Sequence, residues 1–134
     1  MSSPCPSPTR RLCFALDLRD DPSLIAEYEA HHRSVWPHIK HSIAAAGVVD
    51  LSIYRLHTRL FMIMEVDDTF DAERKRESDE SDEMVQAWEE LMWKYQQPLP
   101  WAAPGQKWME MTKIFDLGGE REGKGEERKE GLSE

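Results

Sequence analysis

Arg10-Arg-Leu-Cys-Phe-Ala-Leu-Asp-Leu18 is the stretch that decides the fold, because its side chains alternate in character. One face of the stretch carries apolar side chains, namely Leu12, Phe14, Leu16 and Leu18. The opposite face carries small or charged ones, namely Arg11, Cys13, Ala15 and Asp17. A period of two residues is typical of a β-strand, here one with both faces partly covered. We therefore predict a strand over residues 10–18.

A helical segment that is interrupted once follows this strand. Asp20 or Asp21 can cap its first turn, and Pro22 is tolerated there because that position needs no N–H partner. Apolar side chains then recur at helical spacing. Pro37 removes a backbone hydrogen bond and disfavours helical geometry at the residue before it. The sequence thus predicts two helices that meet at Pro37, the second ending at Gly47.

Two β-rich segments, a further helix and a last strand complete the pattern. Residues 48–56 and 60–66 are rich in strand-forming residues and separated by a short turn, which predicts a hairpin. The acidic stretch 67–83 is expected to be an exposed loop that can include a helical turn. Apolar spacing predicts a helix over about 82–95, and alternation predicts a fourth strand over 108–117. The order β-α-β-β-α-β predicts an α+β fold of the ferredoxin-like type.

This topology leaves one face of the sheet without a helix layer. Two helices cover one face of a four-stranded antiparallel sheet, and something else must cover the other. Met62, Met64, Met109 and Met111 are candidates for that open face. Such a face commonly closes against a second copy of the chain, so we expect a homodimer, a dimeric α/β barrel.

Composition and charge narrow the class of protein. The chain has 134 residues and a net charge of −9, which argues against nucleic acid and anionic membrane as partners. No apolar run is long enough to span a membrane. Cys5 and Cys13 are expected to be free thiols in the cytoplasm. We expect a folded domain over 10–117, a disordered Pro/Ser arm over 1–9 and a disordered charged tail over 118–134.

The densest group of polar and aromatic side chains lies between Glu27 and Pro37. Tyr28 and His32 are four residues apart, so they share one face of a helix. Imidazole can both give and take a proton near neutral pH, which makes His32 the candidate catalytic residue. The same spacing also fits a packed helix boundary in which His32 is hydrogen-bonded and inert. His31 should point elsewhere and be solvated, and His38 with His41 lacks the further ligands that a metal site needs.

At these residues the sequence resembles the L-rhamnose mutarotase family over nearly all of residues 10–117. The matching positions are Glu27–Tyr28, His32, Trp36–Pro37, Gly47, Ser52–Tyr54, Leu60–Phe61, Glu65, Trp93–Tyr95 and Glu110–Leu117. The resemblance implies a small dimeric α/β-barrel enzyme that interconverts the α and β anomers of a 6-deoxy-hexopyranose without cofactor or metal. It implies His32 as the proton donor and Tyr28 as a sugar-binding residue.

Two departures from the family pattern affect the sugar site. Leu51 stands where the best-known bacterial members have a further tyrosine. The paired indoles of those members correspond here to Met92–Trp93 or, in a second register, to Trp88–Glu89. We therefore expect Trp93 or Trp88 to stack on the sugar, with Trp101 as a possible addition. L-Rhamnose is the first candidate substrate and L-fucose the alternative.

Two other classes of function stay open on the sequence alone. One is a non-catalytic small-molecule binder or a cofactor-free monooxygenase of the same architecture, which fold alone does not exclude. A sugar site needs several converging polar groups beside His32, whereas an aromatic substrate needs a dry cavity. The other is an adaptor that interacts with proteins through its charged tail.

Overall fold

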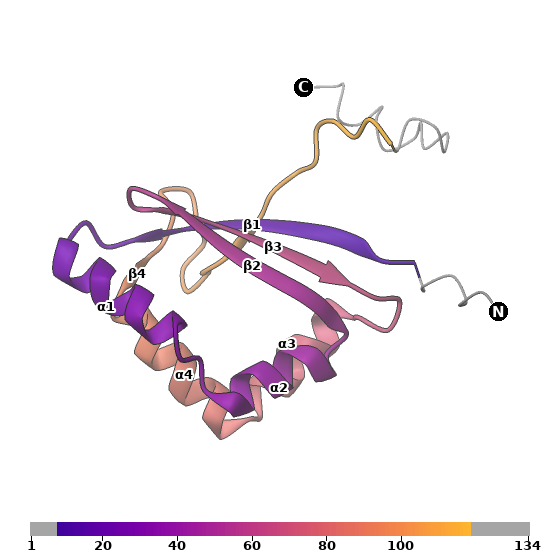
Figure 1. Ribbon diagram of the computed structural model, residues 1–134, viewed down its shortest axis with the longest axis horizontal. Coiled ribbons are helices and arrows are strands. Elements are labelled where there is room, and N and C mark those ends of the chain that lie inside the picture. The colour runs from indigo at the N-terminus through magenta and orange to yellow at the C-terminus, as the bar shows by residue number, and fades with distance from the viewer. Residues whose placement is uncertain (1–7, 119–134) are drawn as a thin grey trace.

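The computed structural model describes residues 8–118, which form one antiparallel sheet with helices on one side (Figure 1). The expected arm and tail, residues 1–9 and 118–134, lie outside the described residues except for Pro8, Thr9 and Gly118. No helix in the described part is long and apolar enough to cross a membrane. The cytoplasmic location stays a prediction.

Residues 10–18 form the predicted strand, β1 (Arg10–Leu18), which lies inside the sheet. It pairs along its length with β3 (Arg59–Val66), which in turn pairs with β2 (Val48–Leu56) through a tight hairpin. All of these pairings are antiparallel, and the strand order is β2-β3-β1-β4, where β4 is the short strand Gln96–Gln97. The α+β ferredoxin-like arrangement is confirmed.

The helices begin and end where local chemistry requires it. Helix α1 (Pro22–His32) is capped by the Asp21 carboxylate, which accepts from two backbone N–H groups of the first turn. Helix α2 (Pro37–Ala45) starts with proline at its first position, so the predicted break before Pro37 is confirmed. Gly47 follows with φ of 102°, a backbone conformation that residues with a Cβ rarely adopt.

The acidic stretch contains a full helix, α3 (Ala72–Glu80), where we expected a loop. None of its residues is buried, so no apolar stripe could reveal it. Its support is local: the Asp71 side chain caps the first turn, Arg76 pairs with both Glu73 and Glu80, and Lys75 pairs with Asp79. Helix α4 (Glu83–Trp93) follows after a short break and matches the prediction more closely.

The fourth strand is much shorter than the sequence predicts. Two short strands share the outer edge of β1: β4 (Gln96–Gln97) pairs with Asp17–Leu18, and β5 (Met109–Glu110) pairs with Phe14–Ala15. The Met111 N–H still donates to the Cys13 carbonyl, and the chain then leaves the sheet (Figure 1). Alternation in 108–117 therefore does not produce a full strand.

The core lies between the sheet and the helices. One face of β1 and β3 points toward the helices, and its residues Leu16, Leu18, Leu60 and Val66 are buried. Met62 and Met64 alternate in step with Leu60, so they also face the helices, and Met64 is buried. Our placement of these two methionines on the open face is therefore wrong. The open face carries Ala15, Tyr54, Phe61 and Ile63 instead.

Candidate functional site

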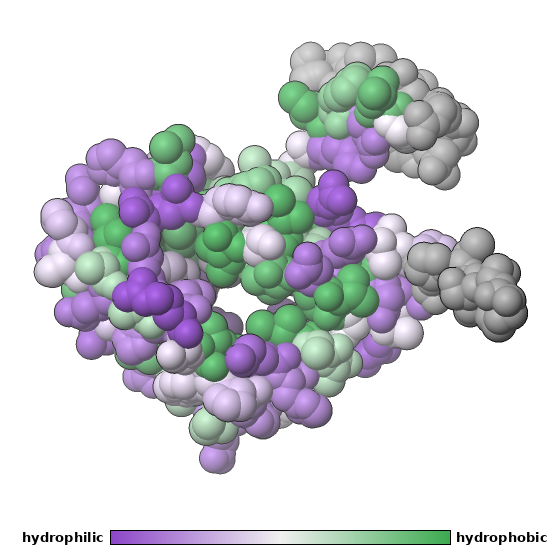
Figure 2. Space-filling view, in the orientation of Figure 1, coloured by the Kyte–Doolittle hydropathy of each residue, from purple (hydrophilic) through white to green (hydrophobic). Residues whose placement is uncertain are grey.

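A cavity of about 650 Å³ separates the sheet from the helix layer. Its walls come from α1, α2, the end of α3, α4, the strands β2 and β3, and Gln96 at the start of β4. Figure 2 shows an opening between the layers, bordered mainly by hydrophobic residues. A volume of this size accommodates a small organic molecule, which makes this cavity the candidate site.

Three of the predicted site residues meet at this cavity. Tyr28 and His32 line it from α1, with ring centroids 4.4 Å apart, and Trp88 lines it from α4. The Trp88 ring stands nearly edge-on to His32, with centroids 5.8 Å apart, and is itself only 8% exposed. The spacing along α1 thus places a phenol and an imidazole beside an indole from a different helix.

Trp93 does not lie among the residues that line the cavity. Its ring instead carries the Lys107 ammonium group, 4.9 Å from the ring centroid. Trp101 is mostly exposed and also lies outside the lining, whereas Trp108 is part of it. Of the two registers considered from the sequence, the one that uses Trp88 brings an indole to His32.

The His32 imidazole is held in one orientation by its own helix. Nδ1 lies 2.9 Å from the carbonyl oxygen of Tyr28 and donates to it, because that oxygen only accepts. The lone pair of the neutral ring is therefore on Nε2, which has no hydrogen-bond partner among the described residues. Burial lowers the pKa of His32, and the nearby His31 lowers it further, although the bond to Tyr28 opposes both. At neutral pH His32 is a neutral base with Nε2 available.

Gln96 is a site residue that the sequence analysis missed. It lines the cavity, is 3% exposed, and donates from Nε2 to the Tyr28 hydroxyl over 3.3 Å. Burial raises the pKa of Tyr28 to about 12, and Glu89 adds to the rise, so Tyr28 keeps its phenolic proton. Nothing in the local sequence marks Gln96, because its burial depends on the pairing of β4 with Leu18.

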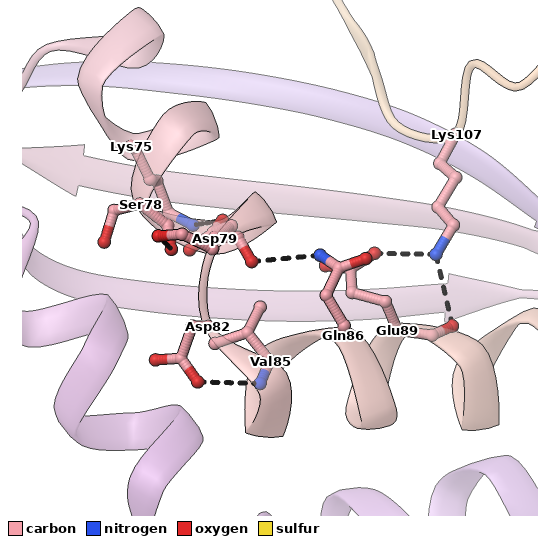
Figure 3. A network of polar contacts seen from close by, with 9 residues as sticks. Lys75, Ser78, Asp79, Asp82, Val85, Gln86, Glu89 and Lys107 are labelled. Atoms are coloured by element: carbon pink, nitrogen blue, oxygen red, sulfur yellow. Dashed lines mark hydrogen bonds and ion pairs between the residues drawn. The ribbon is translucent and has the colours of Figure 1, made fainter.

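Charged residues fix the end of the cavity near α3 and α4 (Figure 3). Lys107 donates to the Glu89 side chain over 2.6 Å and to the Glu89 carbonyl oxygen over 3.2 Å, which ties the segment after β4 to α4. Gln86 donates to the Asp79 carbonyl oxygen and thereby joins α4 to α3. Glu89 and Asp79 are thus carboxylates at the cavity wall that already have partners.

His31 is half-buried, not solvated as we expected. The Tyr95 hydroxyl donates to Glu27, so it accepts from His31 Nε2 at 3.2 Å. These hydrogen bonds join α1, which carries His32, to Tyr95 just after α4. His38 is bonded to Asp82 at 2.7 Å, and no group of three or more His, Cys, Asp or Glu in residues 8–118 is arranged to hold a metal ion.

The fold thus holds a helix-covered cavity with an oriented imidazole and a phenol at its wall, an arrangement that suits the binding of a small molecule and the transfer of a proton. A sequence model of the L-rhamnose mutarotase family matches residues 11–117. The chain belongs to this family, whose mutarotases are isomerases that interconvert the anomers of a sugar.

Two relatives and two solved structures are similar to the chain. The L-fucose mutarotase of Xanthomonas campestris pv. campestris is 47% identical over 110 residues, covering 81% of this chain and 88% of that protein. A UPF0734 protein of Dictyostelium discoideum is 33% identical, covering 77% and 86%. The L-rhamnose mutarotase of Formosa agariphila has a TM-score of 0.61 at 22% identity, covering 81% and 98%. Tetracenomycin F2 cyclase of Streptomyces glaucescens has a TM-score of 0.50 at 19% identity with the same coverage. The two structures support the fold alone.

Proposed function

We propose that this protein interconverts the α and β anomers of a 6-deoxy-L-hexopyranose, with His32 as the proton-transferring residue. The observation that carries the proposal is the neutral, oriented imidazole beside Tyr28 and Trp88 at the cavity. L-Fucose is the first substrate to test, because the relative at 47% identity is an L-fucose mutarotase, and L-rhamnose is the second. This reverses the order expected from the sequence.

Ring opening moves one proton between two oxygens bonded to the same carbon. In the proposed step, His32 Nε2 takes the proton of the anomeric hydroxyl O1–H, and a carbonyl forms between C1 and O1. The C1–O5 bond breaks, and its electron pair stays on O5, which takes the proton back from Nε2. Rotation about C1–C2 and the reverse sequence close the ring on the other face.

The site suits this use of one imidazole as base and then acid. Nδ1 of His32 keeps its proton throughout the reaction and donates it to the Tyr28 carbonyl oxygen. This hydrogen bond stabilises the imidazolium that forms when Nε2 takes up a proton. Tyr28 can hold a sugar hydroxyl through its phenolic proton, and the Trp88 ring offers an apolar wall to the C–H face of the sugar. Since sugars already mutarotate in water, a gain of about 10²–10⁴ from one positioned group suffices.

The test replaces His32 with asparagine, which keeps a polar side chain of similar shape but removes the basic nitrogen. Anomer exchange of L-fucose and L-rhamnose is followed by NMR saturation transfer, and the buffer rate is subtracted. We expect His32→Asn to lose about 10²–10⁴-fold in catalysed exchange. His41→Asn, at an exposed position of α2, is the matched control and should retain the wild-type rate. Equal rates in both variants would remove His32 from the mechanism.

A second candidate function rests on the apolar walls of the cavity. Met62, Met64 and Met92 line it together with aliphatic residues, which also suits an aromatic ligand. A binder or cofactor-free monooxygenase would bind a polycyclic aromatic compound, and added L-fucose would not change that affinity. Titration with such a compound and with L-fucose, followed by NMR, separates this reading from the mutarotase.

We further propose that the protein is a homodimer that covers the open face of the sheet. Tyr54 is exposed there and its ring contacts Phe61, with centroids 6.4 Å apart. The segment that leaves the sheet after β5 adds exposed Ile114, Phe115 and Leu117. An exposed apolar surface of this kind is typical of a protein interface.

A further inference from the structure

Gln96 has a polar atom that the described residues leave without a partner. Apart from the tyrosines, Gln96 is the one polar or charged residue that is buried among residues 8–118. Its Oε1 has no hydrogen-bond partner among these residues. A buried carbonyl oxygen that makes no hydrogen bond destabilises the folded state, so native proteins rarely keep one without reason. Because Gln96 lines the cavity, a bound molecule can supply the missing donor.

The position of this oxygen is fixed by two contacts. The backbone of Gln96 pairs with Leu18 at the edge of β1, and the side-chain Nε2 donates to the Tyr28 hydroxyl over 3.3 Å. A turn of the amide by about 180° would keep a bond to Tyr28, whose hydroxyl would then donate to Oε1, but it would leave Nε2 without a partner instead. One polar atom of the Gln96 amide therefore stays unpaired in either orientation. Tyr28 accepts the bond from Nε2 with its oxygen and keeps its own proton free to donate. The pair thus offers an acceptor and a donor side by side.

We infer that Gln96 determines sugar specificity: its Oε1 accepts a proton from one hydroxyl of the bound sugar, while Tyr28 donates to the oxygen of a neighbouring hydroxyl. This inference rests on the proposed function and extends it to a residue outside the proton-transfer step. The ligand chemistry is a vicinal diol of a monosaccharide. A sugar that lacks the hydroxyl facing Gln96 leaves Oε1 unpaired, and a site built in this way rejects such an analogue strongly.

The experiment pairs a near-isosteric variant with sugars that lack single hydroxyls. Gln96→Met keeps the volume and removes both polar atoms, and Gln97→Met at the exposed neighbouring position is the control. For each protein, kcat/KM for anomer exchange is measured by NMR with L-fucose and with its 2-, 3- and 4-deoxy analogues. For each protein, the kcat/KM of an analogue is divided by that of L-fucose. Comparing this ratio between two proteins cancels the intrinsic reactivity of the analogue.

We expect the wild type and Gln97→Met to lose about 10- to 100-fold in kcat/KM when one particular hydroxyl is removed. Gln96→Met should lose a similar factor with L-fucose itself, but lose no more when that same hydroxyl is absent. A general loss of stability would instead lower the values for all sugars by one factor. Melting temperatures of the three proteins identify such a loss.

Three results would overturn the inference. The first is a wild type that treats all deoxy analogues like L-fucose, which needs no variant to establish. The second is a Gln96→Met protein with unchanged selectivity. If Gln96→Met does not fold, Gln96→Asn, which withdraws the amide by one methylene, takes its place with the same expected result. The third is a wild type that exchanges the anomers of neither L-fucose nor L-rhamnose, which refutes the proposed function itself and so differs from the first two.

Discussion

Burial acts in opposite directions on the two titratable side chains beside the candidate reaction centre. It raises the pKa of Tyr28 to about 12 and lowers the pKa of His32, since in each case the charged form is disfavoured. Both groups are consequently neutral at neutral pH, which suits an uncharged sugar. A neutral imidazole can accept the anomeric proton directly, so His32 is already in the form that the first proposed step requires.

This assignment predicts the pH dependence of the reaction. If neutral His32 takes the anomeric proton, kcat/KM stays constant as the pH falls from about 9 to 6.5, the ordinary pKa of histidine. Because the pKa of His32 is lowered, kcat/KM drops only below pH 6.5, where the imidazole becomes protonated. The profile is measured by NMR exchange, with the acid- and base-catalysed buffer rates subtracted at each pH. A drop that begins above pH 6.5, or a rate that increases as His32 becomes protonated, would contradict the assignment.

The sequence indicates the residues of the candidate site that lie on one helix, but it misses those that tertiary packing adds. Tyr28 and His32 follow from a spacing of four residues. The choice between Trp88 and Trp93 could not be made, because both lie on the last helix and only its packing against α1 decides which indole meets His32. Gln96 carries no local pattern at all.

At the scale of elements, the connection between α2 and β2 depends on Gly47. A Cβ at this position would lie 2.8 Å from both Asp67 Oδ1 and Thr69 Oγ1, which are bonded to each other in the turn after β3. Gly105 also has positive φ, at 78°, but a Cβ there would meet nothing within 4 Å. The two glycines therefore share the backbone strain of a substitution and differ in the steric clash.

We predict that Gly47→Ala lowers the free energy of unfolding by about 2–4 kcal/mol, from backbone strain and overpacking together. Gly105→Ala should lower it by only about 1 kcal/mol, from strain alone. Urea unfolding followed by circular dichroism gives both values. Equal losses would mean that the turn after β3 moves aside freely, and that Gly47 matters only for its backbone angles.

Errors at the element scale have a common physical origin. Helix α3 has no buried residue, so the periodicity that reveals α1 and α4 is missing, and only the Asp71 cap with the ion pairs around Arg76 could have indicated it. Residues 111–117 alternate like a strand, yet they leave β1 after one further backbone bond, from Met111 to Cys13. Alternation predicts that a segment has an apolar side, but not what covers it.

At the scale of the whole molecule, the departure of residues 111–117 from β1 bears on how two copies of the chain could assemble. The helix layer covers one face of the sheet, and the segment after β5 leaves on the other side (Figure 1). Ile114 is 89% exposed and Phe115 67% exposed in the single chain. Large apolar side chains so exposed would be buried if a second copy packed against the open face, and each such burial contributes about 1.5–3 kcal/mol.

We therefore predict that the wild-type chain sediments at twice the mass of one chain, and that Ile114→Asp with Phe115→Asp raises the dimer dissociation constant by at least about 10²-fold. Met84→Asp is the matched control, because Met84 is an exposed apolar residue, 46% accessible, on α4 in the helix layer. Analytical ultracentrifugation over a dilution series measures all three proteins. A monomeric wild type, or a double variant that dimerises like Met84→Asp, would show that the open face and the segment after β5 do not form the interface. Anomer exchange measured on the same samples then tells whether the cavity, which lies on the other side of the sheet, needs the second copy.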